Sequence, residues 1–239
     1  ARRAADWALA SRRIGGGGFR HGAADIAGPY LADNVYMAEA LVALYRSTAE
    51  RRYLVEAEAT AGFLLDRFVD PATGGFLAST RPIAPNLPAP VKQREDNVAA
   101  VRMLSQLSAH AGDRKYRAAA EAGMGYLASP AIQDAADFLP DVLLTEMELT
   151  HEPVHVTIVG AKADPRSRAL YRAALAYPTL HKRAEWWDKA EGKLPNHDVD
   201  YPDYPEPAAF ACTSRFCSKP VTDPALLAES LDALDRRVR

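Results

Sequence analysis

The sequence predicts a mainly α fold of stacked helical hairpins, followed by a small α/β appendage. Three observations lead to this prediction: 46 of the 239 residues are alanine, apolar residues recur at three- and four-residue spacing in the first part of the chain, and one segment is repeated at an offset of 63 residues. Alanine has the highest helix propensity and lets helices pack closely. We therefore divide the chain into residues 1–150, which are helical, and residues 151–239, which form the appendage.

Charge and composition exclude several classes of protein. There are 29 basic and 31 acidic residues, for a net charge of −2, and no long basic run, which argues against a nucleic-acid or anionic-membrane binder. No apolar stretch reaches the roughly 20 residues that cross a bilayer. The sequence has no initial Met and no apolar signal segment, so we expect that a leader was removed or that the chain is a piece of a longer one.

Six segments in the first part of the chain predict helices. Between Leu31 and Glu50, apolar residues recur with the period that places them on one helix face. Turn-forming residues separate the segments: four glycines from Gly15 to Gly18, a turn at 70–75, and a loop at 81–90 with four prolines. The expected helices are 1–13, 31–50, 52–68, 95–111, 113–128 and 140–149.

The internal repeat defines the helical unit. Asp33-Asn34-Val35 recurs as Asp96-Asn97-Val98, and 12 of the 34 positions from 33 to 66 are identical to those 63 residues later. A Gly-Gly-Phe turn precedes each copy, ending at Phe19 and at Phe76. Each repeat thus consists of a turn, a loop, a helix, a tight turn and a second helix, and we expect shared small residues such as Gly62 and Gly125 to let the helix axes approach closely.

The pattern changes after residue 151. The segment 153–160 alternates and is rich in β-branched residues, which is typical of a strand, and 179–187 and 208–216 are expected to be two further strands. The pairs Asp164-Pro165 and Asp223-Pro224 each predict the start of a helix, because Pro suits the first helical position after a capping Asp. A polar, Pro-rich loop covers 193–207.

Two parts of the sequence resemble one family. The repeat "YLADNVYMAEALVALYRSTAERRYLVEAEATAGFLLDRFVDPATGGF" and the tail "VHVTIVG…FACTSRFCSKPVTDPALLAESL" are similar to the C-terminal part of thioredoxin-domain proteins of the YyaL/spermatogenesis-associated protein 20 type, which contain a domain of unknown function. The resemblance implies an (α/α) toroid of the six-hairpin glycosidase-like kind, here partial, with a short β-containing tail that carries a C-x4-C pair. It also implies a carbohydrate ligand.

The toroid that this resemblance implies is incomplete. A closed barrel needs twelve helices and the sequence predicts about six long ones, and residues 1–13 behave as the second helix of a hairpin whose first helix is missing. An open toroid exposes apolar helix faces. We therefore expect a partner to cover them: a missing N-terminal segment, a partner domain or a second copy of the chain.

The candidate site lies in two loops, 14–30 and 70–94, which each join a second helix to the next first helix and so lie at the same end of the toroid. Two carboxyl groups are needed to cleave a glycosidic bond, and epimerisation of a sugar would need a base such as His21. The alternatives are that both Asp-Asn pairs cap helix starts, that His21 is a loop hydrogen-bonder and that the phenylalanines anchor turns to the core. Candidate catalytic residues are Asp33, Glu95, Asp96 and His21, and candidate substrate-binding residues are Phe19, Tyr30, Phe76, Arg81 and Arg94.

The histidines and cysteines of the tail suggest other chemistry. His151 and His155 stand in an H-E-P-V-H string, but Pro153 and the following strand separate imidazoles that a helical zinc motif would bring together, so we expect no metal site. Cys212 and Cys217 are five residues apart and form either a structural disulfide, if the strand turns between them, or a redox-active pair. We expect no cofactor. The location stays open, with the cytoplasm slightly favoured over an extracytoplasmic compartment, in which the pair would be oxidised.

Two functions are consistent with the sequence. The first is a sugar-binding or sugar-processing domain, glycosidase-like or epimerase-like, as the resemblance implies, with catalysis undecided. The second is a non-catalytic scaffold or interaction module associated with a thioredoxin-like redox domain. No thioredoxin-type C-x-x-C is present, so redox activity of that kind is not expected of this chain.

Overall fold

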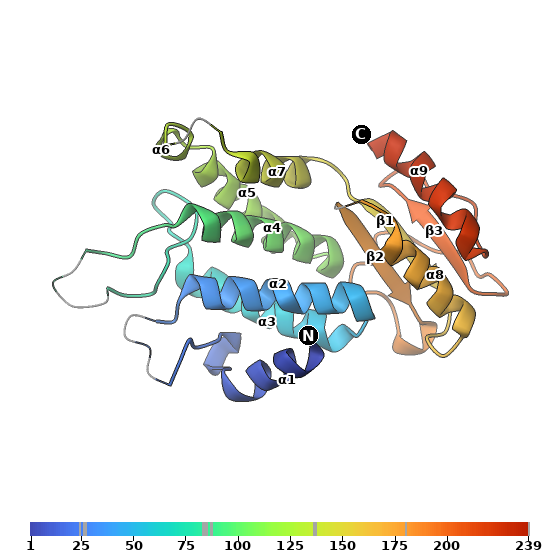
Figure 1. The fold of residues 1–239 in the computed structure, drawn as a ribbon, viewed down its shortest axis with the longest axis horizontal. Helices are drawn as coiled ribbons and strands as arrows, with labels where there is room; N and C mark the ends of the chain where they lie inside the picture. The colour runs from blue at the N-terminus through green and yellow to red at the C-terminus, as the bar shows by residue number, and fades with distance from the viewer. Residues whose placement is uncertain are drawn as a thin grey trace. The chain divides into compact units, whose positions relative to one another are not determined.

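The computed structural model describes residues 1–23, 25, 28–82, 86, 88–135, 138–179 and 181–238. It divides into two compact units, Ala1–Leu149 and Thr150–Arg239, named unit 1 and unit 2 below. The mainly α fold class is confirmed, because unit 1 is built of helical hairpins and the strands belong to unit 2 (Figure 1). The helices of unit 1 are α1 (Arg2–Ser11), α2 (Leu31–Thr48), α3 (Arg51–Phe68), α4 (Arg94–Ala111), α5 (Arg114–Leu127), α6 (Pro130–Gln133) and α7 (Pro140–Thr150), of which the short α6 was not expected.

Two similar hairpins form the centre of unit 1. Helix α2 turns into α3 at Ala49 and α4 turns into α5 at Gly112, and both turn residues adopt the left-handed conformation that ends many helices. Helices α2 and α4 pack side by side, and α7 follows α4 in the same layer, with α3 and α5 behind (Figure 1). The guanidinium of Arg102 on α4 binds both carboxylate oxygens of Glu148 on α7 at 2.8 Å. This arrangement places the N-terminal ends of α2, α4 and α7 at one end of the unit.

The core of unit 1 is the apolar face that the sequence pattern predicts. Tyr53 and Tyr116, which are equivalent in the repeat, are both almost completely buried. The explanation expected for the shared glycines is wrong, because a Cβ at Gly62 or Gly125 would meet nothing within 4 Å. The close approach occurs at Gly123, where a Cβ would lie 2.6 Å from a methyl group of Val101 on α4. None of the helices in the described part of the chain is long and apolar enough to cross a membrane.

Unit 2 contains a three-stranded sheet of order β2-β1-β3 in the residues that the structure describes. Strand β1 pairs in parallel with β2 and antiparallel with β3, and α8 makes the crossover from β1 to β2. The third strand is shorter than expected, because the chain turns back directly after Cys212. The elements are β1 (Val154–Val159), α8 (Pro165–Ala176), β2 (Lys182–Trp187), β3 (Ala208–Cys212) and α9 (Leu227–Val238).

The two faces of this sheet differ in character. Helices α8 and α9 cover one face (Figure 1), where Tyr171 of α8 packs against Trp186 of β2 with ring centroids 4.9 Å apart. Because side chains alternate along a strand, the neighbouring positions point to the other face. There Phe210 and Cys212 of β3 pack with Tyr201 of the covering loop, in a small cluster of their own.

Candidate functional site

The two loops that follow the Gly-Gly-Phe turns meet at the N-terminal end of α2. The backbone N–H of Leu31 donates to the carbonyl oxygen of Ala78 at 2.9 Å, and the guanidinium of Arg81 donates to the carbonyl oxygen of Asp25 at 3.2 Å. These contacts hold the loops side by side, as expected from their equivalent places in the repeat. Parts of both loops, at 24, 26–27, 83–85 and 87, lie outside the described residues, including part of the expected Pro-rich loop.

The asparagines of the repeated Asp-Asn pairs bind the Gly-Gly-Phe turns. The side-chain oxygen of Asn34 accepts the N–H of Phe19 at 2.8 Å, and that of Asn97 accepts the N–H of Phe76 at 2.7 Å. The amide nitrogen of Asn97 also donates to the carbonyl oxygens of Phe76 and Gln93, at 2.9 and 2.8 Å. Both asparagines are fully buried, so each fixes the turn that precedes its own helix.

The expectation that the Asp-Asn pairs cap helix starts is therefore wrong. Helix α2 begins at Leu31 after Tyr30, and α4 begins at Arg94 after Gln93, with no side-chain cap at either end. The two pairs lie inside the first turn of their helices, one turn too late to act as N-caps. Their aspartates are consequently not used up in capping hydrogen bonds.

Asp33 faces His21 across the first loop. Its Oδ1 lies 3.0 Å from Nδ1 of His21, and this hydrogen bond raises the pKa of the imidazole. The side chain of His21 is 74% exposed and that of Asp33 is 25% exposed. The raised pKa of His21 leaves less of the imidazole in the neutral, proton-accepting form at neutral pH, so the arrangement favours a charged partner for Asp33 over the general base that epimerisation requires.

The second carboxylate oxygen of Asp33 lies in a different environment from the first. Its Oδ2 is buried and has no hydrogen-bond partner among the described residues. Such atoms are rare in folded proteins because their desolvation is not compensated. The desolvation of this oxygen is therefore not offset by a hydrogen bond from any of the described residues.

Asp96 is the more buried of the two aspartates, with 7% of the residue exposed. Burial raises its pKa, and the negative charge of Glu95 raises it further, while a hydrogen bond from the hydroxyl of Tyr36 acts in the opposite direction. Tyr36 stands on α2 and is 49% exposed. Sequence reasoning missed it, although its spacing of three residues from Asp33 places both side chains on one face of α2.

Glu95 and Arg94 pair with each other instead of with Asp33 or Asp96. The guanidinium of Arg94 donates to Glu95 at 2.8 Å, and its Nε lies 3.5 Å from a carboxylate oxygen of Asp141 on α7. Arg94 thus joins the first turns of α4 and α7. Glu95 points to solvent with a side chain that is 65% exposed.

The aromatic candidates separate into two groups. Phe19 and Phe76 are 3% and 1% exposed, so the expectation that their rings contact a substrate is wrong and they anchor their turns to the core. Tyr30 is half-buried, and its ring meets the ring of His21 edge-on with centroids 6.1 Å apart. A further aromatic residue, Tyr36, is exposed and is hydrogen-bonded to Asp96.

The first turns of α2, α4 and α7 together form an acidic helix end. Asp33, Asp96 and Asp141 each lie in such a turn, where the positive end of the helix dipole stabilises negative charge. This stabilisation accounts for the presence of acids, but it does not account for the burial of Asp96 or for the unpaired oxygen of Asp33. In this arrangement the carboxyl group of Asp96 keeps its proton to higher pH, and that of Asp33 is paired with the imidazole of His21.

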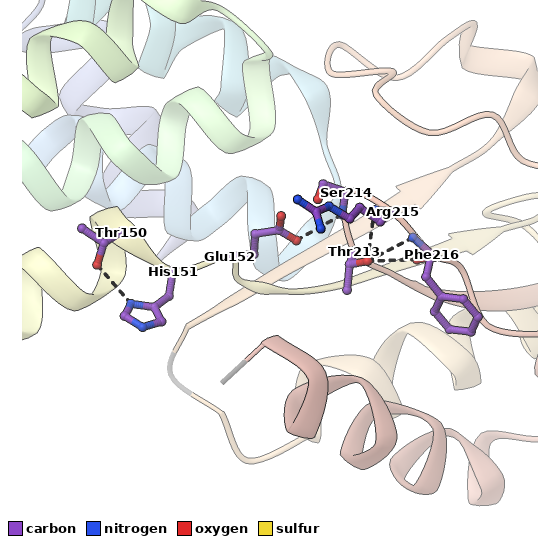
Figure 2. Close-up of a pocket in the computed structure, with 7 residues that line it drawn as sticks. All are labelled: Thr150, His151, Glu152, Thr213, Ser214, Arg215 and Phe216. Atoms are coloured by element: carbon purple, nitrogen blue, oxygen red, sulfur yellow. Dashed lines mark hydrogen bonds between the residues drawn. The ribbon is translucent and has the colours of Figure 1, made fainter.

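Unit 2 contains a separate cavity of about 460 Å³ beside the sheet (Figure 2). One wall is the segment Thr150–Glu152 and the other is the loop Thr213–Phe216. A carboxylate oxygen of Glu152 accepts the backbone N–H of Ser214 at 3.1 Å and so ties the two walls together. The residues that line this cavity are mainly polar and exposed.

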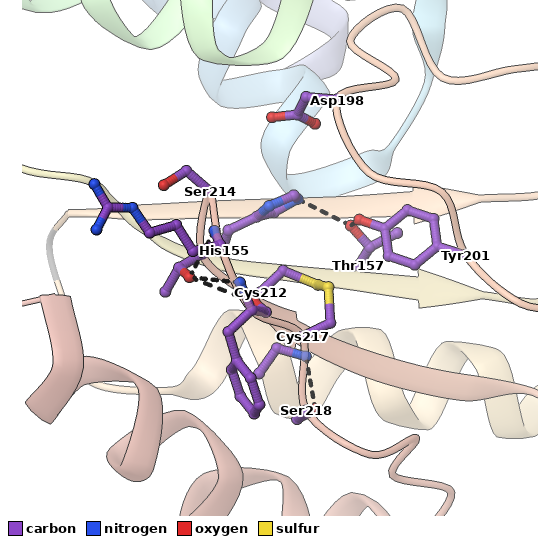
Figure 3. The surroundings of a disulfide bond; sticks show 12 residues. His155, Thr157, Asp198, Tyr201, Cys212, Ser214, Cys217 and Ser218 are labelled. Atoms are coloured by element: carbon purple, nitrogen blue, oxygen red, sulfur yellow. Dashed lines mark hydrogen bonds between the residues drawn. A yellow bond between two sulfur atoms is a disulfide. The ribbon is translucent and has the colours of Figure 1, made fainter.

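The loop between the cysteines is closed by a disulfide bond between Cys212 and Cys217 (Figure 3). The strand turns between them, as a C-x4-C disulfide requires, and the N–H of Thr213 donates to the carbonyl oxygen of Phe216 at 2.7 Å.

His155 lies within β1 while His151 precedes the strand. Within the described ranges, no group of three or more His, Cys, Asp or Glu side chains could hold a metal ion.

Comparison with known proteins finds matches among solved structures. Neither a family model nor a curated protein matches the chain. Among solved structures, the chain is similar to a glycoside hydrolase family 76 (mannosidase) protein, Bt3792 from Bacteroides thetaiotaomicron VPI-5482, with 20% identity and a TM-score of 0.43. The match covers 52% of this chain and 35% of that protein, so the matched part is about a third of its length. The fold described above rests on the hairpins themselves.

Proposed function

We propose that unit 1 binds carbohydrate at the N-terminal ends of α2 and α4 and acts there on a glycosidic bond. The observation that carries this proposal is the relation between Asp33, Tyr36 and Asp96. The two aspartates occupy equivalent positions of successive repeats, and Tyr36 follows Asp33 on α2 and hydrogen-bonds to Asp96 on α4. Two carboxyl groups of different environment therefore belong to one small area of the surface.

The environments suit different roles. Cleavage of a glycosidic bond requires one carboxyl group that protonates the leaving oxygen and a second on the other side of the sugar. Asp96 is suited to the first role, because burial raises its pKa. Asp33 is suited to the second role, because the imidazolium of His21 stabilises its negative charge.

The surroundings offer contacts for a sugar. The exposed ring of Tyr36 presents an apolar face next to both acids, and aromatic side chains of this kind combine an apolar body with a polar end. Arg81 lies across the loop junction and is exposed, so it is available to a hydroxyl group of the ligand. Glu95 and Arg94 would line the α7 side of the same area.

A second function, the non-catalytic interaction module, is favoured by a different observation. Trp7 on α1 is 57% exposed, and Leu143 and Met147 on α7 are 56% and 38% exposed. Helices α1 and α7 lie at the two ends of the helical array of unit 1 (Figure 1). Exposed apolar side chains at both ends suit contact with a preceding segment, a thioredoxin-like domain or a second copy. In that case the acids would serve only the helix ends.

A glycan array compared across three proteins tests the first function. The wild type, the double variant Asp33→Asn/Asp96→Asn and a control double variant Asp66→Asn/Glu121→Gln are applied to the array, and bound glycans are then assayed for release of reducing ends. Asp66 and Glu121 are exposed acids on α3 and α5, in the second layer of unit 1. The control thus removes the same charge from a different surface.

The two functions predict different results. For a carbohydrate site, the wild type and the control bind the same glycans, and the Asp33/Asp96 variant loses both binding and release. Binding that the Asp33/Asp96 variant retains, or no glycan bound by any of the proteins, would contradict the proposal. In the latter case, light scattering of the native protein would show whether it associates, as the interaction module predicts.

A further inference from the structure

The face of the sheet that α8 and α9 do not cover carries a row of polar side chains next to the disulfide. In the sheet register, His155 of β1 is paired with Arg183 of β2 on one side and with Cys212 of β3 on the other. Residues paired in this way point to the same face, with Cβ atoms about 4.5–5.5 Å apart across an antiparallel pair. An imidazole thus stands directly beside the sulfur-bearing residue Cys212 (Figure 3).

The two cysteines differ in accessibility. Cys212 is fully buried within β3. Cys217 is half-buried and ends an exposed loop, Thr213–Phe216, which also forms one wall of the cavity of about 460 Å³. A thiolate that approaches from solvent therefore reaches Cys217 first, and Cys212 is the sulfur that leaves.

The guanidinium on this face is paired with carboxylates, and a chain of hydrogen bonds orients the imidazole of His155. The guanidinium of Arg183 binds Asp198 at 2.7 Å and Glu185 at 3.3 Å, so its charge already has two carboxylate partners. The hydroxyl of Thr157 lies 3.0 Å from Nε2 of His155. The hydroxyl of Tyr201 donates to Thr157 at 2.6 Å, and burial raises the pKa of Tyr201 to about 12, so the phenol stays protonated. This chain of hydrogen bonds holds the imidazole in place beside Cys212.

We propose that the Cys212–Cys217 disulfide is a reducible site that exchanges with a dithiol reductant. A thiolate of the reductant attacks Sγ of Cys217, the Cys212–Cys217 bond breaks, and a mixed disulfide forms on Cys217 while Cys212 leaves as a thiolate and takes a proton from His155. The second thiol of the reductant attacks the mixed disulfide, closes the disulfide of the reductant and releases the thiol of Cys217. Two electrons pass from the reductant to the protein. This activity is independent of the carbohydrate site proposed for unit 1.

Single-cysteine variants test the order of attack. Cys212→Ser and Cys217→Ser are treated with an aromatic disulfide reagent under native conditions, and the release of the aromatic thiol is followed. We expect Cys217 in the first variant to react at least about tenfold faster than Cys212 in the second, because thiol–disulfide exchange requires access to the sulfur. Equal rates, or a faster reaction at Cys212, would overturn the proposed order.

Histidine variants test the proton donor. The full-length oxidised protein is reduced with dithiothreitol between pH 6 and 9, and the thiols are alkylated and counted by mass spectrometry. We expect His155→Gln to slow reduction about tenfold at pH 6 and little at pH 9, because a protonated leaving thiol departs more easily. The control His197→Gln removes an exposed histidine of the same unit that does not line the cavity of about 460 Å³, and should leave the rate unchanged.

The pH profile also separates a proton donor from a merely structural histidine. The other charged or titratable groups on this face are Arg183 and Glu185 of β2, Asp198 and Tyr201 of the covering loop, and Arg215 of the cysteine loop, and they are the same in both variants. A destabilised sheet would speed reduction at every pH. A disulfide that resists dithiothreitol until the protein is unfolded in urea, or identical profiles for the two histidine variants, would overturn the proposal.

Discussion

The side chain of Asn97 binds both backbone groups of Phe76, the residue that ends the second Gly-Gly-Phe turn. Its oxygen accepts the N–H at 2.7 Å, and its nitrogen donates to the carbonyl oxygen at 2.9 Å. Asn34 makes the same pair of bonds to Phe19, at 2.8 and 3.3 Å. The two recurring features of the repeat, the turn and the Asp-Asn pair, are thus the two halves of one interaction that sets the start of α2 and of α4.

This interaction predicts a large loss of stability when the asparagine is removed. Replacing Asn97 by Ala leaves the buried N–H and C=O of Phe76 without partners, and each such group costs about 1–3 kcal/mol. We expect the free energy of unfolding, measured by urea denaturation, to fall by about 2–4 kcal/mol. Gln93→Ala, which removes an exposed side chain but keeps the backbone acceptor, should change it by less than about 0.5 kcal/mol. Similar values for the two variants would contradict the role of Asn97.

The glycines of the repeat should respond in opposite directions. Gly75 has a positive φ of 70°, and a Cβ there would lie 2.8 Å from the side chains of Asn97 and Tyr126, so Gly75→Ala should destabilise the protein by more than about 1 kcal/mol. Gly125 lies inside α5 with open space around it, so Gly125→Ala should stabilise the protein by about 0.5–1 kcal/mol. Thermal denaturation of both variants checks the signs. Destabilisation by Gly125→Ala would show that the helix packs more tightly there than described.

The buried carboxyl group of Asp96 predicts a dependence of stability on pH. Its pKa in the folded protein is raised, mainly by burial, above the value of about 3.9 in an unfolded chain. The unfolded chain therefore loses the proton first, and the free energy of unfolding falls as the pH rises from about 3.9 through the raised pKa. Asp96→Asn has no such proton. The Tm of the variant minus that of the wild type should therefore be lowest near pH 3.5 and increase toward neutral pH. A difference that is constant with pH would show that Asp96 ionises normally.

The pairing of His21 with Asp33 predicts a shift that NMR can measure directly. A hydrogen bond and the charge of Asp33 raise the pKa of His21. In Asp33→Asn we expect the pKa of His21 to fall toward its ordinary value of about 6.5. Asp25→Asn removes a weaker electrostatic contribution and should lower it less. An equal fall in both variants would mean that Asp33 is not the main partner.

Much of the fold could be predicted from the sequence, because the elements of unit 1 are set by local patterns. The apolar period of α2 and α3 and the 63-residue repeat depend only on which residues share a helix face. The role of Asn34 could not be predicted in this way. Asp-Asn near a helix start is typical of a cap, and only the three-dimensional path of the loop shows that the asparagine binds Phe19 instead.

The site could be predicted in part. The repeat predicts the two aspartates, and the alternating direction of successive helices predicts that both loops lie at one end of unit 1. Tyr36 has no counterpart in the second repeat, where Ala99 stands, so the repeat gave no reason to select it. The burial of Phe19 and Phe76 depends on long-range packing, which sequence spacing does not contain.

Hydrogen–deuterium exchange with a saturating amount of the glycan that binds most tightly on the array is the most direct test of the carbohydrate site. Amide exchange is measured by mass spectrometry with and without the glycan. If the ligand binds where Asp33, Tyr36 and Asp96 meet, exchange slows in the first turns of α2 and α4 and in the loops before them, and is unchanged in unit 2. Slower exchange confined to unit 2, or no change in unit 1 at saturation, would contradict the account.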